Sequence, residues 1–166
     1  ASIGIAILPS DAEDQKELLR LADLAMYKAK EAGRNQYHFF AQEMQQQVNR
    51  RVELEPLLRA ALEQQRLTVH YQPIVDTVSG KLYGVEALMR WPTDFGQYIS
   101  PAEFIPVAEE CGMLLSLGHW ALCKACEQTK TWHVRGLADL QVAVNVSPSQ
   151  LLSANFTMSV FKCLEE

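Results

Sequence analysis

A carboxylate and a guanidinium share one face of a strand-like stretch in the middle of the chain. In "YGVEALMRW", residues 83–91, side chains alternate between two faces, so Glu86, Leu88 and Arg90 lie together. The opposite face is apolar. A carboxylate is able to hold a divalent cation, and a guanidinium is able to bind a phosphate through two parallel hydrogen bonds. The alternative interpretation is a structural pair between Glu86 and Arg90 that serves no ligand.

Two amide side chains add further polar chemistry. Asn145 in "AVNVSP" comes late in a strand, and its side-chain oxygen suits Mg²⁺ or Mn²⁺, which prefer oxygen ligands. Taken alone, Asn145 is better explained as a capping or turn residue. Gln72 in "VHYQPIV" lies on the strand face opposite Tyr71, and its amide can both donate and accept hydrogen bonds. The plainer interpretation of Gln72 is a polar residue that ends a strand before Pro73.

The composition restricts the classes of protein that fit this sequence. The chain has 166 residues, 48% of them hydrophobic, and a net charge of −5, with no long run of Lys or Arg. This argues against binding to DNA or RNA duplexes, whereas a small anionic ligand held by a few basic residues is compatible. No apolar run approaches the roughly 18 residues of a membrane span, and the start lacks a signal peptide's basic segment. Because the sequence opens without Met, directly in a strand-like run, we expect an excised segment of a longer protein.

The four cysteines do not form a recognisable metal-binding pattern. Cys123 and Cys126 make a CxxC, which on its own is half of a zinc or redox site. They lie in the helical pattern "GHWALCKACEQTKTW", and no second CxxC or suitably spaced histidine pair completes a zinc site. We therefore expect Cys111, Cys123, Cys126 and Cys163 to be ordinary core cysteines in a reducing cytoplasm.

Strand and helix patterns alternate along the chain. "SIGIAIL" predicts a strand, and "QKELLRLADLAMYKAKEAG" predicts a helix that Asp14 or Ser10 caps and Gly33 ends. "NQYHFF" then predicts a short closing strand. Residues 41–55 favour a connecting helix, and Pro56 suits the first turn of a fresh helix.

Beyond Arg66 the same alternation continues. "LTVHYQPIVD", "LYGVEALMRW" and "LQVAVNVSP" predict strands, and the first two are joined by a hairpin-like turn at Gly80. The segments between and after them predict helices: "PAEFIPVAEECG", "LLSLGHWALCKACEQTKTWH" and "NFTMSVFKCLEE". This order favours parallel sheet units, and apolar residues on both strand faces predict a sheet that is covered on both sides or closed into a barrel.

These stretches resemble two domain families that occur together in bacterial signalling proteins. "SIGIA" and "ADLAMYKAKEAGRNQYHFF" are similar to the C-terminal end of a GGDEF (diguanylate cyclase) domain. "LEPLLRAALEQQRLTVHYQPIVD", "VEALMRW", "PAEFIPVAEECGMLLSLGHWAL" and "VNVSPSQL" resemble the first part of an EAL (cyclic-di-GMP phosphodiesterase) domain. The resemblance implies an α/β chain in three parts. Residues 1–40 match the last strand–helix–strand of the GGDEF domain, 41–55 form a linker helix, and 56–166 form a partial TIM-like (β/α) barrel.

The resemblance also implies roles for the polar residues. The parent protein is expected to hydrolyse cyclic di-GMP to the linear dinucleotide with Mg²⁺ or Mn²⁺. Glu86, the Glu of the family's signature, matches a metal ligand that is essential for catalysis, and Asn145 matches a second metal ligand. Leu88 and Arg90 match substrate contacts, and Gln72 matches a contact to a base.

Parts of both families' sites are missing from these 166 residues. Lys30 and Arg34 match a pair that contacts the nucleotide triphosphate in GGDEF domains, although taken alone they are solvated charges at a helix end. No Gly-Gly-Asp-Glu-Phe loop is present, so we expect no cyclase activity. A TIM-like barrel needs roughly 250 residues. The paired aspartates and the Lys that complete the phosphodiesterase site would follow Glu166, so the isolated segment is expected to be inactive.

Two other interpretations stay open. A catalytically inactive EAL domain would act as a cyclic-di-GMP receptor or regulatory module, and a scaffold fragment would bind no ligand. The acidic residues that complete the site would distinguish a hydrolase from a receptor. The resemblance further implies a homodimer through the EAL domain, an upstream sensor domain in the parent protein, and a cytoplasmic location with any membrane anchor outside this segment.

Overall fold

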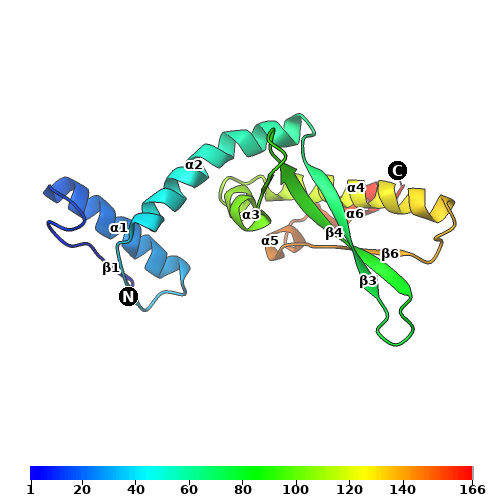
Figure 1. Cartoon of the computed structure of the whole chain (residues 1–166), viewed down its shortest axis with the longest axis horizontal. Coiled ribbons are helices and arrows are strands. Elements are labelled where there is room, and N and C mark those ends of the chain that lie inside the picture. The colour runs from blue at the N-terminus through cyan, green and yellow to red at the C-terminus, as the bar shows by residue number, and fades with distance from the viewer. Residues whose placement is uncertain (166) are drawn as a thin grey trace. The chain divides into compact units, whose positions relative to one another are not determined.

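The structure is a computed structural model that describes residues 1–165 and divides into two compact units. One unit comprises Ala1–Glu53, and the other begins at Leu54. Figure 1 labels the helices and strands of each. Within residues 1–165, none of the helices combines the length and the hydropathy that a membrane span requires.

The first unit packs one helix on a two-stranded parallel sheet. β1 (Ile3–Ile5) pairs with β2 (Tyr37–Phe39), and α1 (Gln15–Glu31) connects them. The side chains that α1 buries are small or apolar: Leu21, Ala25 and Ala29. The helix lies so close to β1 that a Cβ on Gly4 would collide with the backbone of Ala22. The predicted strand, helix and closing strand are therefore confirmed.

Both ends of α1 follow from local sequence. Asp14 is the N-cap, and its side chain accepts a hydrogen bond from the backbone nitrogen of Glu17 at 2.9 Å. This confirms one of the two predicted caps. At the other end Gly33 has a φ of 105°, a left-handed conformation that glycine adopts without strain. The backbone nitrogen of Arg34 then donates to the carbonyl of Ala29 at 3.0 Å and closes the helix.

A single helix, α2 (Gln42–Glu63), replaces the two helices that the sequence predicted. Pro56 lies inside it, so the prediction of a fresh helix at this proline is wrong. Proline has no N–H to offer the carbonyl of Val52, but Val52 is 69% exposed and water is able to satisfy that carbonyl. Leu54 and Leu58, on either side of the proline, are both buried. Their burial on one helical face favours a continuous helix.

The second unit is built on an open, mixed sheet. β3 (Thr68–Val75) and β4 (Leu82–Pro92) are antiparallel, and β6 (Gln141–Val144) is parallel to β4 on its other side. β5 (Tyr98–Ile99) extends the pairing at the end of β4. The prediction of parallel units holds for β4 and β6, and the predicted hairpin-like turn at Gly80 is confirmed for β3 and β4. Their connection, residues 76–81, is a tight turn, whereas a parallel crossover needs a dozen or more residues.

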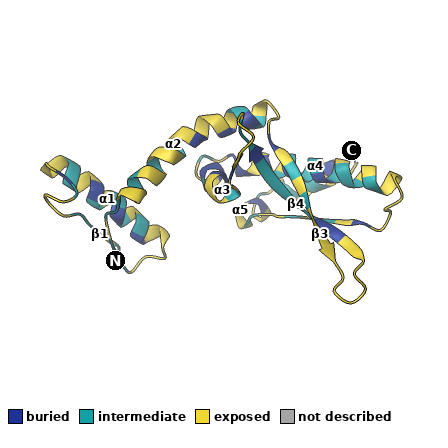
Figure 2. Ribbon diagram, viewed as in Figure 1, coloured by how far each residue is buried: buried dark blue, intermediate teal, exposed yellow. Residues whose placement is uncertain are grey.

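Helices pack against one face of this sheet. α4 (Leu114–Val134) crosses behind β3 and β4 (Figure 1), and α3 (Pro101–Glu110) precedes it. α5 (Pro148–Leu151) and α6 (Phe156–Glu165) follow β6. The largest fully buried side chains of the unit lie on its helices: Phe104, Leu54, Leu58 and Leu117. The buried side chains of β4 are Val85, Ala87 and Trp91, which share one face, so this core lies on one side of the sheet. Figure 2 colours buried positions dark blue.

The strands form a sector of a barrel and not a closed barrel. Within residues 1–165, β3 pairs with β4 alone, and β3 and β6 are the two edges of the sheet. On the side away from α4, Gln72 and Ala143 are exposed and Glu86 is half-buried. This side is the one that would line a barrel, so the predicted partial (β/α) architecture is confirmed.

Two of the four cysteines are joined, which corrects the expectation of four ordinary core cysteines. Cys123 on α4 and Cys163 on α6 form a disulfide. Cys111 and Cys126 are free and half-buried, and burial raises the pKa of the Cys126 thiol. In the sequence, Cys126 is the cysteine nearest to Cys123, in a CxxC. The actual partner lies 40 residues away, and helix packing brings it into reach.

Candidate functional site

The central strand β4 separates structural residues from candidate site residues. Val85, Ala87 and Trp91 are at most 6% exposed and face the helices. The alternate positions, Glu86 and Arg90 among them, are half-buried and face the open side. A strand presents successive side chains to opposite faces, so this division is the one that the sequence predicted. The polar face of β4 is therefore available to a ligand.

The pairing of β3 with β4 extends the polar face by one strand. Gln72 lies directly opposite Glu86 in the antiparallel register, and His70 lies opposite Leu88. Directly paired residues share a face of the sheet and bring their side chains close together. Gln72 thus lies beside Glu86, as the site prediction requires. His70 also faces this side and packs edge-on against the Tyr98 ring, with the ring centroids 5.4 Å apart.

His70 was missed by sequence reasoning. It lies two positions before Gln72 on β3, so the period of two that selected Gln72 would also have selected His70. The predicted hairpin places β3 beside β4, but it does not say which residues of the two strands are paired. The strand pairing supplies that information.

The contact between Glu86 and Asn145 is the centre of the candidate site. β6 runs parallel to β4, with Ala143 opposite Glu86, so Asn145 follows two positions later on the same side. Its amide nitrogen Nδ2 donates a hydrogen bond to Oε1 of Glu86 at 2.7 Å. These residues are 59 positions apart in sequence. Parallel pairing of their strands brings them together.

The Glu86–Asn145 pair fits part of a site for a hard divalent cation. Carboxylate and amide oxygens are the ligands that Mg²⁺ and Mn²⁺ prefer. The two ends of an amide are nearly indistinguishable in shape, so a half-turn of the Asn145 side chain presents its oxygen in place of Nδ2. Mg²⁺ takes about six ligands. Within residues 1–165, Glu86 belongs to no cluster of three or more His, Cys, Asp or Glu side chains, so this pair supplies a share of a coordination shell.

A small pocket lies beside Asn145, between the ends of β4 and β6 and the helices α3 and α4, whose Ile105, Leu114 and Gly118 help to line it. Its volume is about 280 Å³, and Leu88, Arg90 and Asn145 are among the residues that line it. The Arg90 guanidinium donates one hydrogen bond from Nη1 to the carbonyl of Met89 at 2.9 Å, which leaves further donors for an anion. Three of the predicted site residues thus border one pocket near the carboxyl ends of the strands, whereas Glu86 and Gln72 lie outside its lining.

A buried glutamine supports the backbone immediately after Asn145. Ser147 and Gln150 form a reciprocal capping box at the start of α5, with Ser147 N donating to Gln150 Oε1 at 3.0 Å. Gln150 is 5% exposed and packs against Gly118 of α4. A Cβ at Gly118 would collide with the Gln150 amide. The sequence reasoning did not use this support, although the S-x-x-Q spacing of residues 147–150 is a known capping signal.

The predicted phosphate-contact residues of the first unit lie at the end of α1. Lys30 is in its last turn, and Arg34 follows the helix with a φ of 62°. Both are exposed. The role of Lys30 and Arg34 as phosphate contacts stays a prediction, because no other candidate nucleotide-binding residue of the first unit lies beside them.

Two family models match this chain, and they follow the order that the sequence motifs predicted. The model of the family described as "EAL domain" matches residues 57–166, and that of "Diguanylate cyclase, GGDEF domain" matches residues 1–36. One relative is the "Bifunctional diguanylate cyclase/cyclic di-GMP phosphodiesterase MucR" of Pseudomonas aeruginosa, 43% identical over 99% of this chain and 24% of the relative. Another is "Cyclic di-GMP phosphodiesterase PdeR" of Escherichia coli, 39% identical over 99% of this chain and 25% of the relative. The chain thus spans about a quarter of the length of these relatives.

Solved structures share the fold. The structure described as "PaMucR Phosphodiesterase, c-di-GMP complex" is 42% identical with a TM-score of 0.62, and the match covers 65% of this chain and 44% of that one. The EAL enzyme Bd1971 in its cAMP- and cyclic-di-GMP-bound form has a TM-score of 0.65 over 94% of this chain and 41% of that one. It is 24% identical, so it supports the fold alone.

Proposed function

The chain belongs to the EAL domain family, and from this membership we propose that it is part of a cyclic-di-GMP phosphodiesterase. The proposed reaction is metal-dependent hydrolysis of cyclic di-GMP to the linear dinucleotide. It is the activity of a complete EAL domain that contains this segment, because the described residues form an open sheet with two candidate metal ligands.

The observation that carries the proposal is the pairing of Glu86 with Asn145 beside the pocket lined by Arg90. A carboxylate and an amide offer oxygen ligands to Mg²⁺ or Mn²⁺, and a guanidinium offers paired donors to a phosphate. Glu86 and Arg90 come from β4, and Asn145 directly follows its parallel neighbour β6. Two relatives whose names include cyclic-di-GMP phosphodiesterase, MucR and PdeR, match nearly the whole chain.

Each residue has one proposed role. Glu86 and Asn145 hold the metal, whose function in such hydrolases is to lower the pKa of a bound water and to stabilise charge on the phosphoryl oxygens. Arg90 binds a phosphate oxygen and orients it, because its planar guanidinium offers two parallel N–H groups. Leu88 packs against the ligand from the same face, and Gln72 hydrogen-bonds a guanine edge.

The proposal includes the rest of the chain. Residues 1–40 are the end of a GGDEF domain, in which Lys30 and Arg34 are the remaining triphosphate contacts. Residues 41–55 are a linker helix, and 56–166 begin the EAL domain. The family matches at 1–36 and 57–166 support this division. We further propose a cytoplasmic protein that forms a homodimer through its EAL domain and receives its signal from an upstream sensor domain.

The test is a chimera in which residues 57–165 replace the matching segment of MucR. The chimera is expected to hydrolyse cyclic di-GMP when Mg²⁺ or Mn²⁺ is present. The substitution Glu86→Gln removes a charged metal ligand worth several kcal/mol, so turnover should fall about 1,000-fold or more. Turnover is followed by chromatography of the linear product.

Glu127→Gln is the matched control, because Glu127 lies on α4 and pairs with Lys124 at 2.8 Å on the helical surface. It should leave turnover unchanged. Full turnover in Glu86→Gln, or hydrolysis that needs no metal, would refute the assignment. Tight binding of cyclic di-GMP without hydrolysis would instead favour the receptor, an EAL domain that signals by contact.

A further inference from the structure

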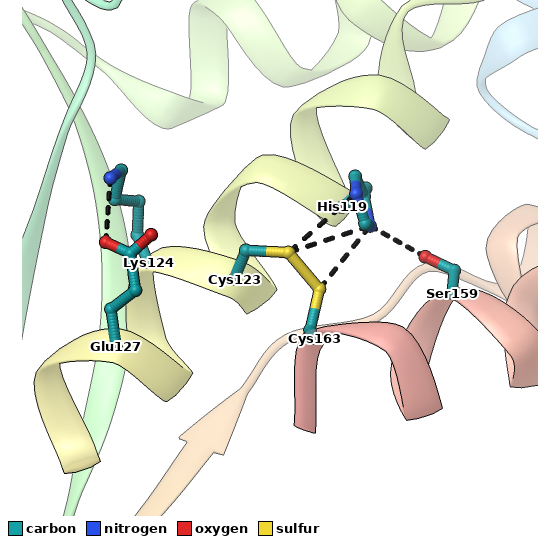
Figure 3. Close-up of a disulfide and its surroundings, with 6 residues drawn as sticks. All are labelled: His119, Cys123, Lys124, Glu127, Ser159 and Cys163. Carbon is teal, nitrogen blue, oxygen red and sulfur yellow. Dashed lines mark hydrogen bonds and ion pairs between the residues drawn. A yellow bond between two sulfur atoms is a disulfide. The ribbon is translucent and has the colours of Figure 1, made fainter. Parts of the chain in front are cut away.

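A second group of metal-binding side chains lies on the helices, with a chemistry unlike that of Glu86 and Asn145. His119 and Cys123 are one turn apart on α4, and Cys163 reaches them from α6 (Figure 3). Their ligand atoms all lie within 4.8 Å of one another. Within residues 1–165 this is the one cluster of three such side chains close enough to share an ion.

The ring of His119 faces both sulfurs. Its Nδ1 lies 3.6 Å from Sγ of Cys163 and 3.9 Å from Sγ of Cys123, and its Nε2 lies 3.7 Å from Sγ of Cys123. The hydroxyl of Ser159 on α6 is 2.7 Å from Nδ1, so this nitrogen gives up its hydrogen bond to Ser159 when it binds an ion. The imidazole is already positioned against both cysteines while the disulfide is formed.

We propose that His119, Cys123 and Cys163 form a zinc-type site once the disulfide is reduced. A dithiol supplies the two electrons and two protons, becomes a disulfide itself, and leaves two cysteine thiols in the protein. Binding of one divalent ion then releases both thiol protons, because the thiolate is the metal ligand. The site joins α4 to α6 through the ion, in place of the covalent bond.

The observed geometry fits this ion. With metal–sulfur bonds of about 2.3 Å and metal–nitrogen bonds of about 2.0 Å, tetrahedral ligands place nitrogen about 3.5 Å from sulfur. From Nδ1, the nitrogen near both sulfurs, the observed distances are 3.6 and 3.9 Å, so the imidazole has to turn from Ser159 but needs little translation. The main change is separation of the two sulfurs. His119 and Cys123 are four residues apart on one helix, a spacing that keeps both on the same face.

The ligand types separate this cluster from the site on the open face. Thiolate and imidazole ligands select zinc-like ions, whereas carboxylate and amide oxygens suit Mg²⁺ or Mn²⁺. Cys163 is 3% exposed and His119 lies at the surface, so the cluster is closed on one side and open on the other. Its three protein ligands leave one position of a tetrahedral ion for water or an added ligand.

The test uses the full chain and Co²⁺, which reports tetrahedral thiolate ligands through charge-transfer and d–d absorption. The chain is reduced with dithiothreitol without oxygen, desalted, and titrated with Co²⁺ and then Zn²⁺. We expect one equivalent of Co²⁺ with thiolate bands, displaced by Zn²⁺. The oxidised chain should show no thiolate bands. A Cys111→Ser, Cys126→Ser double variant, which keeps only the two cluster cysteines, should behave like the parent chain.

Two histidine variants on α4 decide the outcome. His119→Gln should weaken Co²⁺ binding at least tenfold, and because His119 is exposed the variant is expected to keep its helical circular dichroism. His133→Gln is the matched control, since His133 bonds the Leu140 carbonyl at 2.8 Å away from the cluster. Absence of thiolate bands in the reduced chain, or equal affinity in His119→Gln, would overturn the proposal. A Co²⁺ spectrum without thiolate bands would place the ion at oxygen ligands and would also overturn it.

Discussion

The two faces of the sheet in the second unit differ in what contacts them. On one face Val85, Ala87 and Trp91 pack against the helices and are almost fully buried. On the other, Glu86 contacts Asn145 and lies beside Gln72, and the surroundings are open. Both sets alternate along the same strand. One face therefore provides stability and the other offers polar groups to a ligand, with the backbone of β4 shared between them.

This division implies that stability and ligand binding respond to different substitutions. Removing an apolar side chain from the helix-facing side leaves a cavity in a packed core, which is costly. Removing a polar side chain from the open side leaves groups that water can solvate, which costs little. The comparison fails if the two kinds of substitution have similar effects on unfolding.

The largest expected effect is on the helix-facing side. Trp91→Ala should lower the free energy of unfolding by about 3–5 kcal/mol, because Trp91 is 5% exposed and packs edge-on against Phe104. Glu86→Ala, on the opposite face of the same strand, should change the free energy of unfolding by less than about 0.5 kcal/mol. Urea unfolding followed by circular dichroism measures both. A loss at Glu86 comparable to that at Trp91 would show that the open face is structural.

Local periodicity explains why the two faces were predictable from sequence. The period of two in β4 placed Glu86, Leu88 and Arg90 together without knowledge of any partner strand. The helix of the first unit was equally predictable, because Asp14 and Gly33 mark its ends by local chemistry. Such features depend on residues within one or two turns of each other.

Long-range features were not predictable in this way. The contact of Glu86 with Asn145 depends on parallel pairing across 59 residues, and only resemblance to a family suggested it. The disulfide of Cys123 depends on how α6 packs on α4. Pro56 misled the local interpretation, because burial of leucines on both sides of it outweighed its preference for a helix start. In each case tertiary packing decided the outcome.

The second effect tests the support beneath the open face. Gly118→Ala places a methyl group where the Gln150 amide lies, and overpacking of this kind costs about 1–3 kcal/mol. The expected result is a lower unfolding free energy together with weaker divalent-metal binding, since Gln150 caps α5 directly after Asn145. Urea unfolding and titration with Mn²⁺ measure the two effects.

A double-mutant cycle with Gln150→Ala sharpens this test. Shortening Gln150 removes the side chain that the new methyl group would strike, so the two substitutions should cost less together than the sum of their separate costs. Strict additivity would show that the packing of Gly118 against Gln150 does not limit the position of α5.

The third effect concerns the ligand alone. Arg90→Lys keeps the charge but removes the paired planar donors, so affinity for cyclic di-GMP in the MucR chimera should fall about tenfold, or roughly 1.4 kcal/mol. The unfolding free energy should not change, because the guanidinium donates to the carbonyl of Met89, its own neighbour along the strand. Calorimetric titration without metal, which prevents turnover, measures the affinity. Arg66→Lys, at an exposed pair with Asp94, is the control and should bind normally.

The smallest effect returns to the helix-facing side and depends on pH. The Tyr71 hydroxyl donates to the carbonyl of Lys124 at 3.2 Å, so Tyr71→Phe should cost about 1 kcal/mol near pH 7. Burial raises the pKa of Tyr71, and the nearby Glu127 and Cys126 raise it further. A raised pKa means that the unfolded chain ionises first. The contribution of Tyr71 is therefore complete below its unfolded pKa of about 10 and is lost as the pH rises through the folded pKa. Urea unfolding at about pH 7 and pH 10.5 measures this contribution as the difference in unfolding free energy between the parent and Tyr71→Phe. The difference should be smaller at pH 10.5. An equal difference at both pH values would mean that the Tyr71 hydroxyl ionises as readily in the folded chain as in the unfolded one.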